Sequence, residues 1–171
     1  NFDAVISQMR ERLAAPAFAV SLPWGREEGF RGVIDLIAMK ALSFDGESLG
    51  SKVVAQEIPA DLAARAEKAR AILVEAVAER DAHVLAAYME NADVAPELLK
   101  QGIRRATLAG VFVPVLCGSS LKNKGVQQLL DAVVDYMPSP LDVPPVVGHH
   151  PKTEKEVVRK ADDAEPLSAL A

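Results

Sequence analysis

Cysteine is almost absent from the chain, and long apolar runs are missing altogether. One cysteine, Cys117, cannot form an internal disulfide, and with three scattered histidines it cannot form a Cys/His metal site. No apolar run approaches the roughly 18 residues that a membrane span needs. The first residues, Asn-Phe-Asp, do not follow the pattern of a secretory signal peptide. These absences predict a cytoplasmic protein in a reducing compartment, with no membrane partner and no bound metal.

Positive charge is also scarce, with 19 lysine and arginine residues against 24 aspartate and glutamate residues and a net charge of −5. Binding to a phosphate backbone needs clustered Lys and Arg, so no nucleic-acid partner is expected. The chain lacks the Gly-x-x-x-x-Gly-Lys-Ser/Thr loop that holds nucleotide phosphates. It also lacks an initial Met, which suggests a fragment of a larger protein. Its 171 residues are enough for one domain with a small additional subdomain.

The chain does contain apolar patterns of both helical and strand type, which are typical of a mixed α/β protein. Amphipathic stretches alternate with short apolar runs and with turns that contain Gly or Pro. Helices are expected over residues 2–14, 61–90 (with a break near Asp81), 96–108 and 126–136. Strands are expected over residues 17–22, 30–37, 40–44, 52–57 and 111–117, with Asp45-Gly46 as a turn.

Proline is concentrated toward the C-terminal end. Six of the 11 prolines lie at or beyond residue 138, and Pro144-Pro145 cannot form the interior of a helix. This segment is therefore predicted to be an extended linker, with His149 and His150 solvated within it. The last residues, 165–171, have the pattern of the first strand of another domain.

A small polar turn, Gly118-Ser119-Ser120-Leu121, follows the apolar strand expected over 111–117. At the end of such a strand, backbone N–H groups face the crevice where α/β proteins bind ligands, and they could donate to a ligand carbonyl. The alternative is a helix N-cap with no ligand. A nucleophile pair of Cys117 and His83 is a weaker interpretation, because a small buried thiol is far commoner at the end of an apolar strand.

Four blocks of the sequence resemble the translation elongation factor G family, in that family's order. The longest block runs from Val113 through the Ser-Ser-Leu turn to Pro144 and resembles the end of the GTPase domain. The others are residues 19–25 (AVSLPWG), 30–41 (FRGVIDLIAMKA) and 161–170 (ADDAEPLSAL). Several long blocks in order form a much more specific signal than one tetrapeptide.

The resemblance implies an α/β fold: part of a P-loop-GTPase-like parallel sheet, interrupted by a small α+β insert of sheet plus helices. It also implies a whole protein that hydrolyses GTP to drive movement of tRNA and mRNA on the ribosome. The implied divisions are 1–24 and 111–137 from the GTPase domain, 25–110 as the G-prime insert, and 138–171 as a proline-rich linker with the start of domain II.

The same resemblance places Ser119, Ser120 and Leu121 in the family's fifth nucleotide-binding motif, which is usually Ser-Ala-Leu. There the backbone N–H of the middle residue meets the guanine carbonyl oxygen, a contact that serine in place of alanine preserves. Lys122 and Gly125 would shape the start of the next helix. The groups that hold the phosphates and magnesium would lie before residue 1. The resemblance therefore implies GTP and GDP as ligands of the whole protein, and these 171 residues alone are expected to have no catalytic residue, no metal and negligible nucleotide affinity.

The implied partners are the ribosome and its stalk protein, which in this family faces the insert. On the helix expected from Asp61, Lys68, Glu75 and Glu79 lie opposite Leu73 and Val77 and are the candidate stalk-binding residues. The alternative is an ordinary solvated helix face. Truncation would also leave strand 111–117 with an unpaired edge, which predicts self-association of the fragment.

Two other interpretations remain open. The chain could be a free-standing protein-interaction module with no enzymatic parent. It could also come from a paralogous ribosomal GTPase, such as a release, ribosome-protection, recycling or organellar factor, since these share the fifth motif. The block at 30–41 and the proline-rich exit favour elongation factor G.

Overall fold

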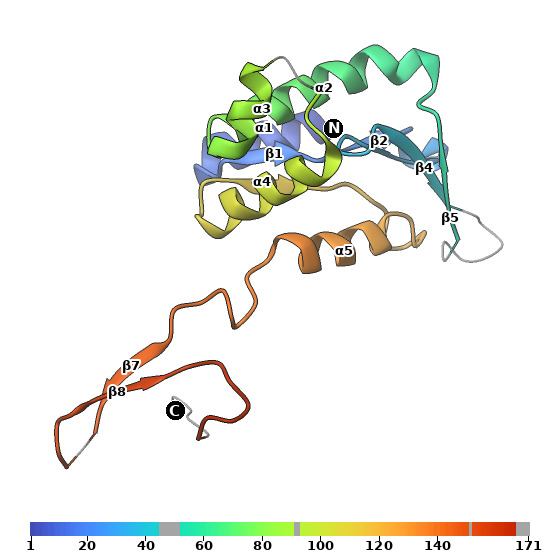
Figure 1. Cartoon of the computed structure of the whole chain (residues 1–171). Helices are drawn as coiled ribbons and strands as arrows, with labels where there is room; N and C mark the ends of the chain where they lie inside the picture. The colour runs from blue at the N-terminus through green and yellow to red at the C-terminus, as the bar shows by residue number, and fades with distance from the viewer. Residues whose placement is uncertain (45–51, 91–92, 151, 167–171) are drawn as a thin grey trace. The chain divides into compact units, whose positions relative to one another are not determined.

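The computed structural model describes residues 1–44, 52–90, 93–150 and 152–166 (Figure 1). Within these ranges the fold is mixed α/β, with one small parallel sheet and two antiparallel sheets. The chain forms two compact units, Asn1–Met137 and Pro138–Ala171. No helix in the described ranges is both long enough and apolar enough to cross a membrane.

The parallel sheet joins two segments that are far apart in the sequence. Strand β1 (Ala17–Ala19) pairs with β6 (Val113–Val115), with Ala17 opposite Val113 and Ala19 opposite Val115. Helix α1 (Phe2–Leu13) precedes β1, and the predicted helix over 2–14 is confirmed. The side chain of Arg10 fixes the helix to the strand by donating from Nε to the Ala17 carbonyl at 2.8 Å. Everything between β1 and β6 is inserted between two neighbouring strands of one sheet.

The predicted single strand over 17–22 is wrong, because the chain changes sheets at Val20. The Val20 N–H donates to Val115 O at 3.0 Å, toward the parallel sheet. Its carbonyl accepts from Leu36 N at 3.1 Å, on the side of the second sheet. The next strand, β2 (Ser21–Trp24), therefore belongs to the antiparallel sheet, which begins before residue 25.

The antiparallel sheet has four strands in the order β2-β3-β4-β5. Its other members are β3 (Gly32–Asp35), β4 (Lys40–Phe44) and β5 (Val53–Gln56), preceded by a short 3-10 helix, η1 (Glu27–Gly29). The strand predicted over 30–37 is shorter because Asp35 ends it. Asp35 Oδ1 accepts from the N–H groups of Ile37 at 2.7 Å and Ala38 at 3.1 Å, closing a turn into β4. The predicted Asp45-Gly46 turn lies outside the described residues.

Three helices follow the sheet: α2 (Ala60–Ala78), α3 (Ala82–Met89) and α4 (Pro96–Leu108). The predicted break near Asp81 is confirmed: Asp81 caps α3 by accepting from His83 N at 3.2 Å and Val84 N at 3.0 Å. The predicted limits of α4 are also confirmed, with Pro96 in its first turn and Gly110 just past its end at φ +72°.

The core lies where the sheet meets these three helices. Gly102 lets α4 pack closely against α2 and α3. A Cβ at this position would lie 2.6 Å from Val84 Cγ2 and 2.8 Å from Val77 Cγ1. The largest fully buried side chains are Phe112, Ile34, Leu36, Leu73, Leu99, Ile103, Val33, Val77 and Val84.

Helix α5 (Val126–Tyr136) closes the first unit beside α4 (Figure 1). Arg104 of α4 donates to Asp135 O at 2.9 Å, and only Ala132 and Tyr136 of α5 are buried. The opposite stripe of the helix is apolar but exposed, and consists of Leu129, Leu130, Val133, Val134 and Met137 just past the helix end.

The second unit contains a β-hairpin, so residues 138–171 are not extended linker throughout. Strands β7 (Val146–His149) and β8 (Glu156–Arg159) pair antiparallel, with Val146 opposite Arg159. The hairpin closes with His150 N donating to Lys155 O at 2.9 Å. Of the strand predicted over 165–171, only Glu165 and Pro166 lie within the described residues.

Candidate functional site

The Ser119-Ser120-Leu121 segment forms a tight turn at the end of the chain segment that leaves β6. Ser119 and Lys124 exchange two backbone hydrogen bonds, of 2.8 and 2.9 Å, and Asn123 N donates to Ser120 O at 3.0 Å. Asn123 takes a left-handed φ of 50°, which asparagine tolerates well. The turn is therefore closed by its own backbone and does not depend on α5.

The free donors of this turn are at its tip. Ser119 N–H is used by Lys124 O, whereas Ser120 N–H has no hydrogen-bond acceptor among the residues that the structure describes. Ser120 is exposed, and Leu121 is 96% exposed. An exposed, unused N–H at the middle position can donate to a ligand carbonyl. The alternative of a helix N-cap at Gly118–Leu121 is wrong, because the N-cap of α5 is Gly125.

Two glycines let the two ends of the turn meet. A Cβ on Gly118 would lie 2.7 Å from Lys124 O, and one on Gly125 would lie 3.0 Å from Cys117 O. Gly125 also takes a φ of +84°, which strains any residue with a side chain. The close approach of Gly118 and Gly125 thus fixes the direction in which the turn projects from the end of the strand.

Lysine side chains hold the turn against the loop around η1. Lys124 Nζ donates to Phe30 O at 2.9 Å, and Lys122 Nζ approaches Glu27 O at 3.5 Å. Gly125 begins α5 as expected, whereas Lys122 contacts the η1 loop. No sequence pattern indicates these contacts, since each joins a side chain to a backbone carbonyl more than 90 residues away.

Cys117 has a structural role beside the turn. The Ser21 hydroxyl accepts from Cys117 N at 3.2 Å and lies 3.5 Å from Cys117 Sγ. Burial raises the pKa of the Cys117 thiol to about 11, a shift that the Ser21 hydrogen bond only partly offsets. A thiol of that pKa stays protonated at neutral pH, so these contacts do not support a Cys117–His83 nucleophile pair.

Lys68, Glu75 and Glu79 lie on one side of α2 and at its C-terminal end, and all three are exposed. Their spacing of seven and four residues brings them onto one stripe. Glu79 is engaged by Arg80, with 2.9 Å between Oε2 and Nη1. Ile72, 48% exposed, lies between them along the stripe. The result is a solvent-facing strip with mixed charge and one apolar side chain.

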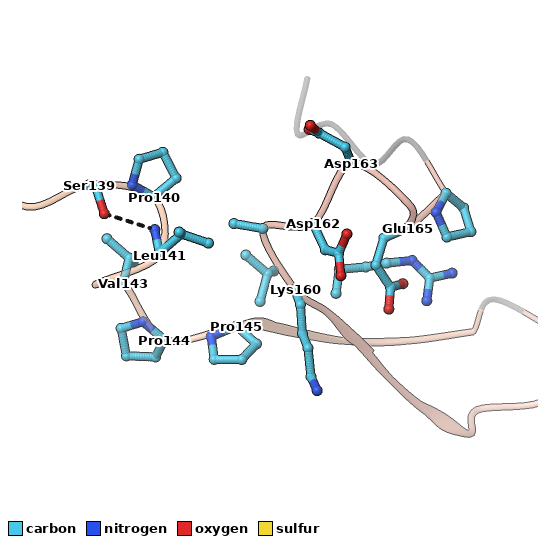
Figure 2. Close-up of a pocket in the computed structure, with 14 residues that line it drawn as sticks. Ser139, Pro140, Leu141, Val143, Pro144, Pro145, Lys160, Asp162, Asp163 and Glu165 are labelled. Carbon is cyan, nitrogen blue, oxygen red and sulfur yellow. Dashed lines mark hydrogen bonds between the residues drawn. The ribbon is translucent and has the colours of Figure 1, made fainter.

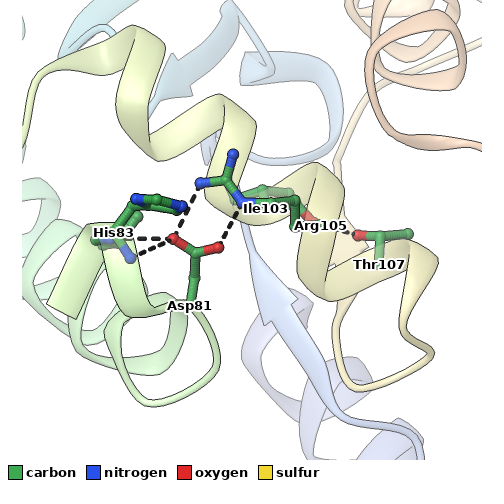
Figure 3. Close-up of polar contacts among 6 residues, drawn as sticks. Asp81, His83, Ile103, Arg105 and Thr107 are labelled. Atoms are coloured by element: carbon green, nitrogen blue, oxygen red, sulfur yellow. Dashed lines mark hydrogen bonds and ion pairs between the residues drawn. The ribbon is translucent and has the colours of Figure 1, made fainter.

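The sequence pattern does not indicate the ion pair between Asp81 and Arg105. Asp81 accepts from Arg105 Nε at 2.6 Å and from Nη2 at 3.0 Å while it also caps α3 (Figure 3). The hydrogen bond from Arg105 holds the pKa of Asp81 at about 2, against a smaller opposing effect of burial. The sequence pattern indicates a break near Asp81, but neither its capping role nor its partner 24 residues later. This cluster is structural, since its groups satisfy one another.

A wide, open hollow of about 1320 Å³ lies in the second unit between the chain before β7 and the chain after β8 (Figure 2). Two of its polar residues, Ser139 and Asp162, form local hydrogen bonds. Ser139 donates to Asp142 Oδ2 at 2.7 and 2.8 Å, and Asp162 Oδ1 accepts from Ala164 N at 2.9 Å. Figure 2 shows the carboxylates of Asp162, Asp163 and Glu165 pointing in different directions. The hollow therefore lacks the converging polar groups of a ligand site.

No group of three or more His, Cys, Asp or Glu side chains suited to a metal occurs among the described residues. No model of a known protein family matches the sequence. The structure is similar to the crystal structure of ttk003000868 from Thermus thermophilus, with a TM-score of 0.70 and 25% sequence identity. The match covers 92% of this chain and 24% of the other, so the chain spans about a quarter of the length of the Thermus protein.

Proposed function

We propose that this chain is part of a ribosome-dependent GTPase of the elongation factor G type, the class that moves tRNA and mRNA during translation in the cytoplasm. The observation that carries the proposal is the exposed turn at Ser119–Leu121, whose middle N–H is unused, at the end of a parallel strand. This is the arrangement expected for a contact to the guanine carbonyl.

The topology supports the same interpretation. Strands β1 and β6 are adjacent and parallel, and the antiparallel sheet and helices α2–α4 are inserted between them. A P-loop-GTPase-like sheet that carries a G-prime insert would have this connectivity. The similarity to part of a much longer protein is also consistent with a segment of a multidomain factor.

The residues present fit one edge of a guanine and nothing more of the nucleotide. The sequence has no phosphate-binding loop, and the described residues have no metal cluster. GTP or GDP and its magnesium would therefore be held by other residues of the whole protein. The 171 residues alone are expected to give no measurable heat of GTP binding at sub-millimolar nucleotide.

A chimera tests the proposal: an elongation factor G whose corresponding segment is replaced by this chain. The expected result is GTP hydrolysis that depends on ribosomes. Ser120→Pro removes the proposed N–H donor and is expected to weaken guanine-nucleotide affinity about tenfold, in line with the loss of one hydrogen bond in a closed site. Ser120→Ala keeps the N–H and is the matched control, with affinity unchanged. A folded chimera that does not respond to ribosomes would contradict the proposal.

The stalk contact is a separate part of the proposal, assigned to the stripe of Lys68, Glu75 and Glu79. Reversing Glu75 and Glu79 to Lys in the chimera is expected to slow stalk-dependent phosphate release severalfold, because charge reversal changes association rates most strongly. Glu90→Lys, which reverses an exposed charge at the end of α3, is the control. If the double variant released phosphate at the unchanged rate, this stripe would not be part of the stalk contact.

A further inference from the structure

The Ser119–Leu121 turn is tied to the inserted antiparallel sheet on both sides, and both contacts reach the hairpin of β2 and β3. Before the turn, Cys117 N donates to the Ser21 hydroxyl, at the start of β2, at 3.2 Å. After the turn, Lys124 Nζ donates to Phe30 O, two residues before β3, at 2.9 Å. The turn follows β6 in the chain, but its side-chain contacts are with the insert.

The carbonyl group of Phe30 lies in a loop that its own backbone closes. Arg31 N donates to Trp24 O at 2.8 Å across the base of this loop. Gly25 takes a φ of +92°, and a Cβ there would lie 2.0 Å from Gly29 O, so a side chain at this position would force the loop open. The acceptor of the lysine is therefore held in a defined place by the hairpin.

Lys124 connects this loop to the turn, because its backbone and its side chain contact different parts of the molecule. Its backbone N–H and C=O exchange hydrogen bonds of 2.9 and 2.8 Å with Ser119, the residue before Ser120. Its side chain is half-buried and reaches the Phe30 carbonyl. Lys122, by contrast, is exposed and approaches its acceptor in η1 only to 3.5 Å. A displacement of the loop would therefore be transmitted to the turn mainly through Lys124.

We propose, on the basis of the function proposed above, that Lys124 is a positioning residue for the guanine contact and that the inserted sheet places the Ser120 N–H through it. Hydrogen bonds depend strongly on distance and angle, so a small displacement of the turn weakens the bond to the guanine carbonyl. The phosphates would be held by other residues of the whole protein, and their contacts would not change. The effect of Lys124 on nucleotide affinity should therefore depend on the acceptor atom that the base presents to Ser120.

Amide hydrogen exchange of the 171-residue chain tests the connection without any nucleotide. In Lys124→Met the Ser119 N–H is expected to exchange about fivefold faster, because its acceptor, Lys124 O, loses the side-chain anchor. Lys124→Arg keeps a donor for the Phe30 carbonyl and should restore the parent rate to within about twofold. Lys100→Met, at a half-buried lysine of α4, is the control. An unchanged Ser119 rate in Lys124→Met would overturn the inference.

A second variant disturbs the same connection from the side of the insert. Gly25→Ala is expected to speed the exchange of Ser119 N–H as Lys124→Met does, because the added methyl would displace the loop that carries the acceptor. Gly29→Ala is the matched control in the same loop, since a Cβ there meets nothing within 4 Å. Circular dichroism confirms that each variant is folded, and Lys124→Met alone decides if Gly25→Ala does not fold. A folded Gly25→Ala variant with the parent rate would overturn control by the insert.

The elongation factor G chimera tests the consequence for guanine. Lys124→Met is expected to weaken GDP binding about fivefold but binding of 6-thio-GDP less than about twofold, because sulfur is a weak acceptor for the Ser120 N–H. Lys124→Arg should restore the affinity for GDP. Equal losses for both nucleotides would mean that Lys124 only stabilises the fold, and would overturn the inference. A parent chimera that binds neither nucleotide would instead contradict the proposed function, whereas hydrogen exchange decides the connection to the insert separately.

Discussion

At the scale of single residues, the structure separates one ion pair with a buried carboxylate from several ion pairs in which both partners are exposed. The Asp81 side chain is 5% exposed and receives two hydrogen bonds from Arg105 in addition to two from the α3 backbone. By contrast, the Arg65–Asp3 pair has both side chains at least 40% exposed. Exposed ion pairs contribute little to the free energy of unfolding because water and salt screen the charges. Asp81 is therefore a carboxylate whose loss should lower stability more than the loss of an exposed one such as Asp3.

Replacing Asp81 by Asn is expected to lower the free energy of unfolding at pH 7 by about 1–2 kcal/mol. A fall in pKa from 3.8 to about 2 corresponds to somewhat more than this, but Arg105 is 41% exposed and water screens the pair. Asparagine can still cap the helix, so the loss of unfolding free energy measures the contribution of the carboxylate charge. Urea unfolding measures it, with Asp61→Asn as the control at an exposed carboxylate of α2.

The same pair predicts the pH dependence of stability. The folded-state pKa of Asp81 is lower than its unfolded value, so its stabilising effect is complete above about pH 4. It is lost as the pH falls through the folded pKa of about 2. The difference in unfolding free energy between the parent chain and Asp81→Asn should therefore shrink between about pH 4 and pH 2. A constant difference over that range would mean that the carboxylate charge has no such role.

At the scale of secondary-structure elements, features that depend on neighbouring residues could be predicted from the sequence. Features that depend on contacts between distant residues could not. The helix break near Asp81 and the Pro96 start of α4 depend on neighbouring residues, so the local sequence pattern is enough to predict them. The change of sheet at Val20 depends on Val115 and Leu36, which no local pattern reveals. The turn at Ser119–Leu121 was predicted as a turn, but its anchoring through Lys124 to Phe30 was not.

Helix α5 illustrates why amphipathic patterns do not fix orientation. Its apolar stripe is exposed, with Val134 at 78%, while Gln128 and Asp135 of the other stripe line a small inner cavity. Periodicity identifies two faces, but the side that is covered depends on the neighbouring elements. The cavity therefore could not be foreseen from sequence, since its walls come from the sheet, α4 and α5 together.

Close packing of helices leads to a prediction at Gly102. Gly102→Ala is expected to lower the free energy of unfolding by about 1–3 kcal/mol, because the added methyl would clash with Val84 and Val77, both fully buried. Gly29→Ala is the matched control, as a Cβ there meets nothing within 4 Å. Thermal and urea unfolding measure both variants. A neutral or stabilising effect at Gly102 would mean that α4 can shift away from α2 and α3 at little cost.

At the scale of the whole molecule, the first unit combines a well-packed core with open strand edges and exposed apolar side chains. The core joins the antiparallel sheet to α2, α3 and α4. In the described part of the chain, the parallel sheet contains only β1 and β6, so each of these strands has one open edge. Unpaired strand edges and contiguous exposed apolar side chains favour association with another chain.

Self-association is accordingly expected through these surfaces. Sedimentation of the 171-residue chain from micromolar to millimolar concentration should show growth of a dimer or larger species. Leu130→Glu with Val134→Glu places charges on the exposed apolar stripe of α5, where these side chains are 60% and 78% exposed, and should shift the transition to at least tenfold higher concentration. Met89→Glu, at an apolar residue of α3 that is 71% exposed, is the control and should leave it unchanged. Monomeric sedimentation of the parent chain over the whole range would show that open edges and an apolar helix face are tolerated without a partner.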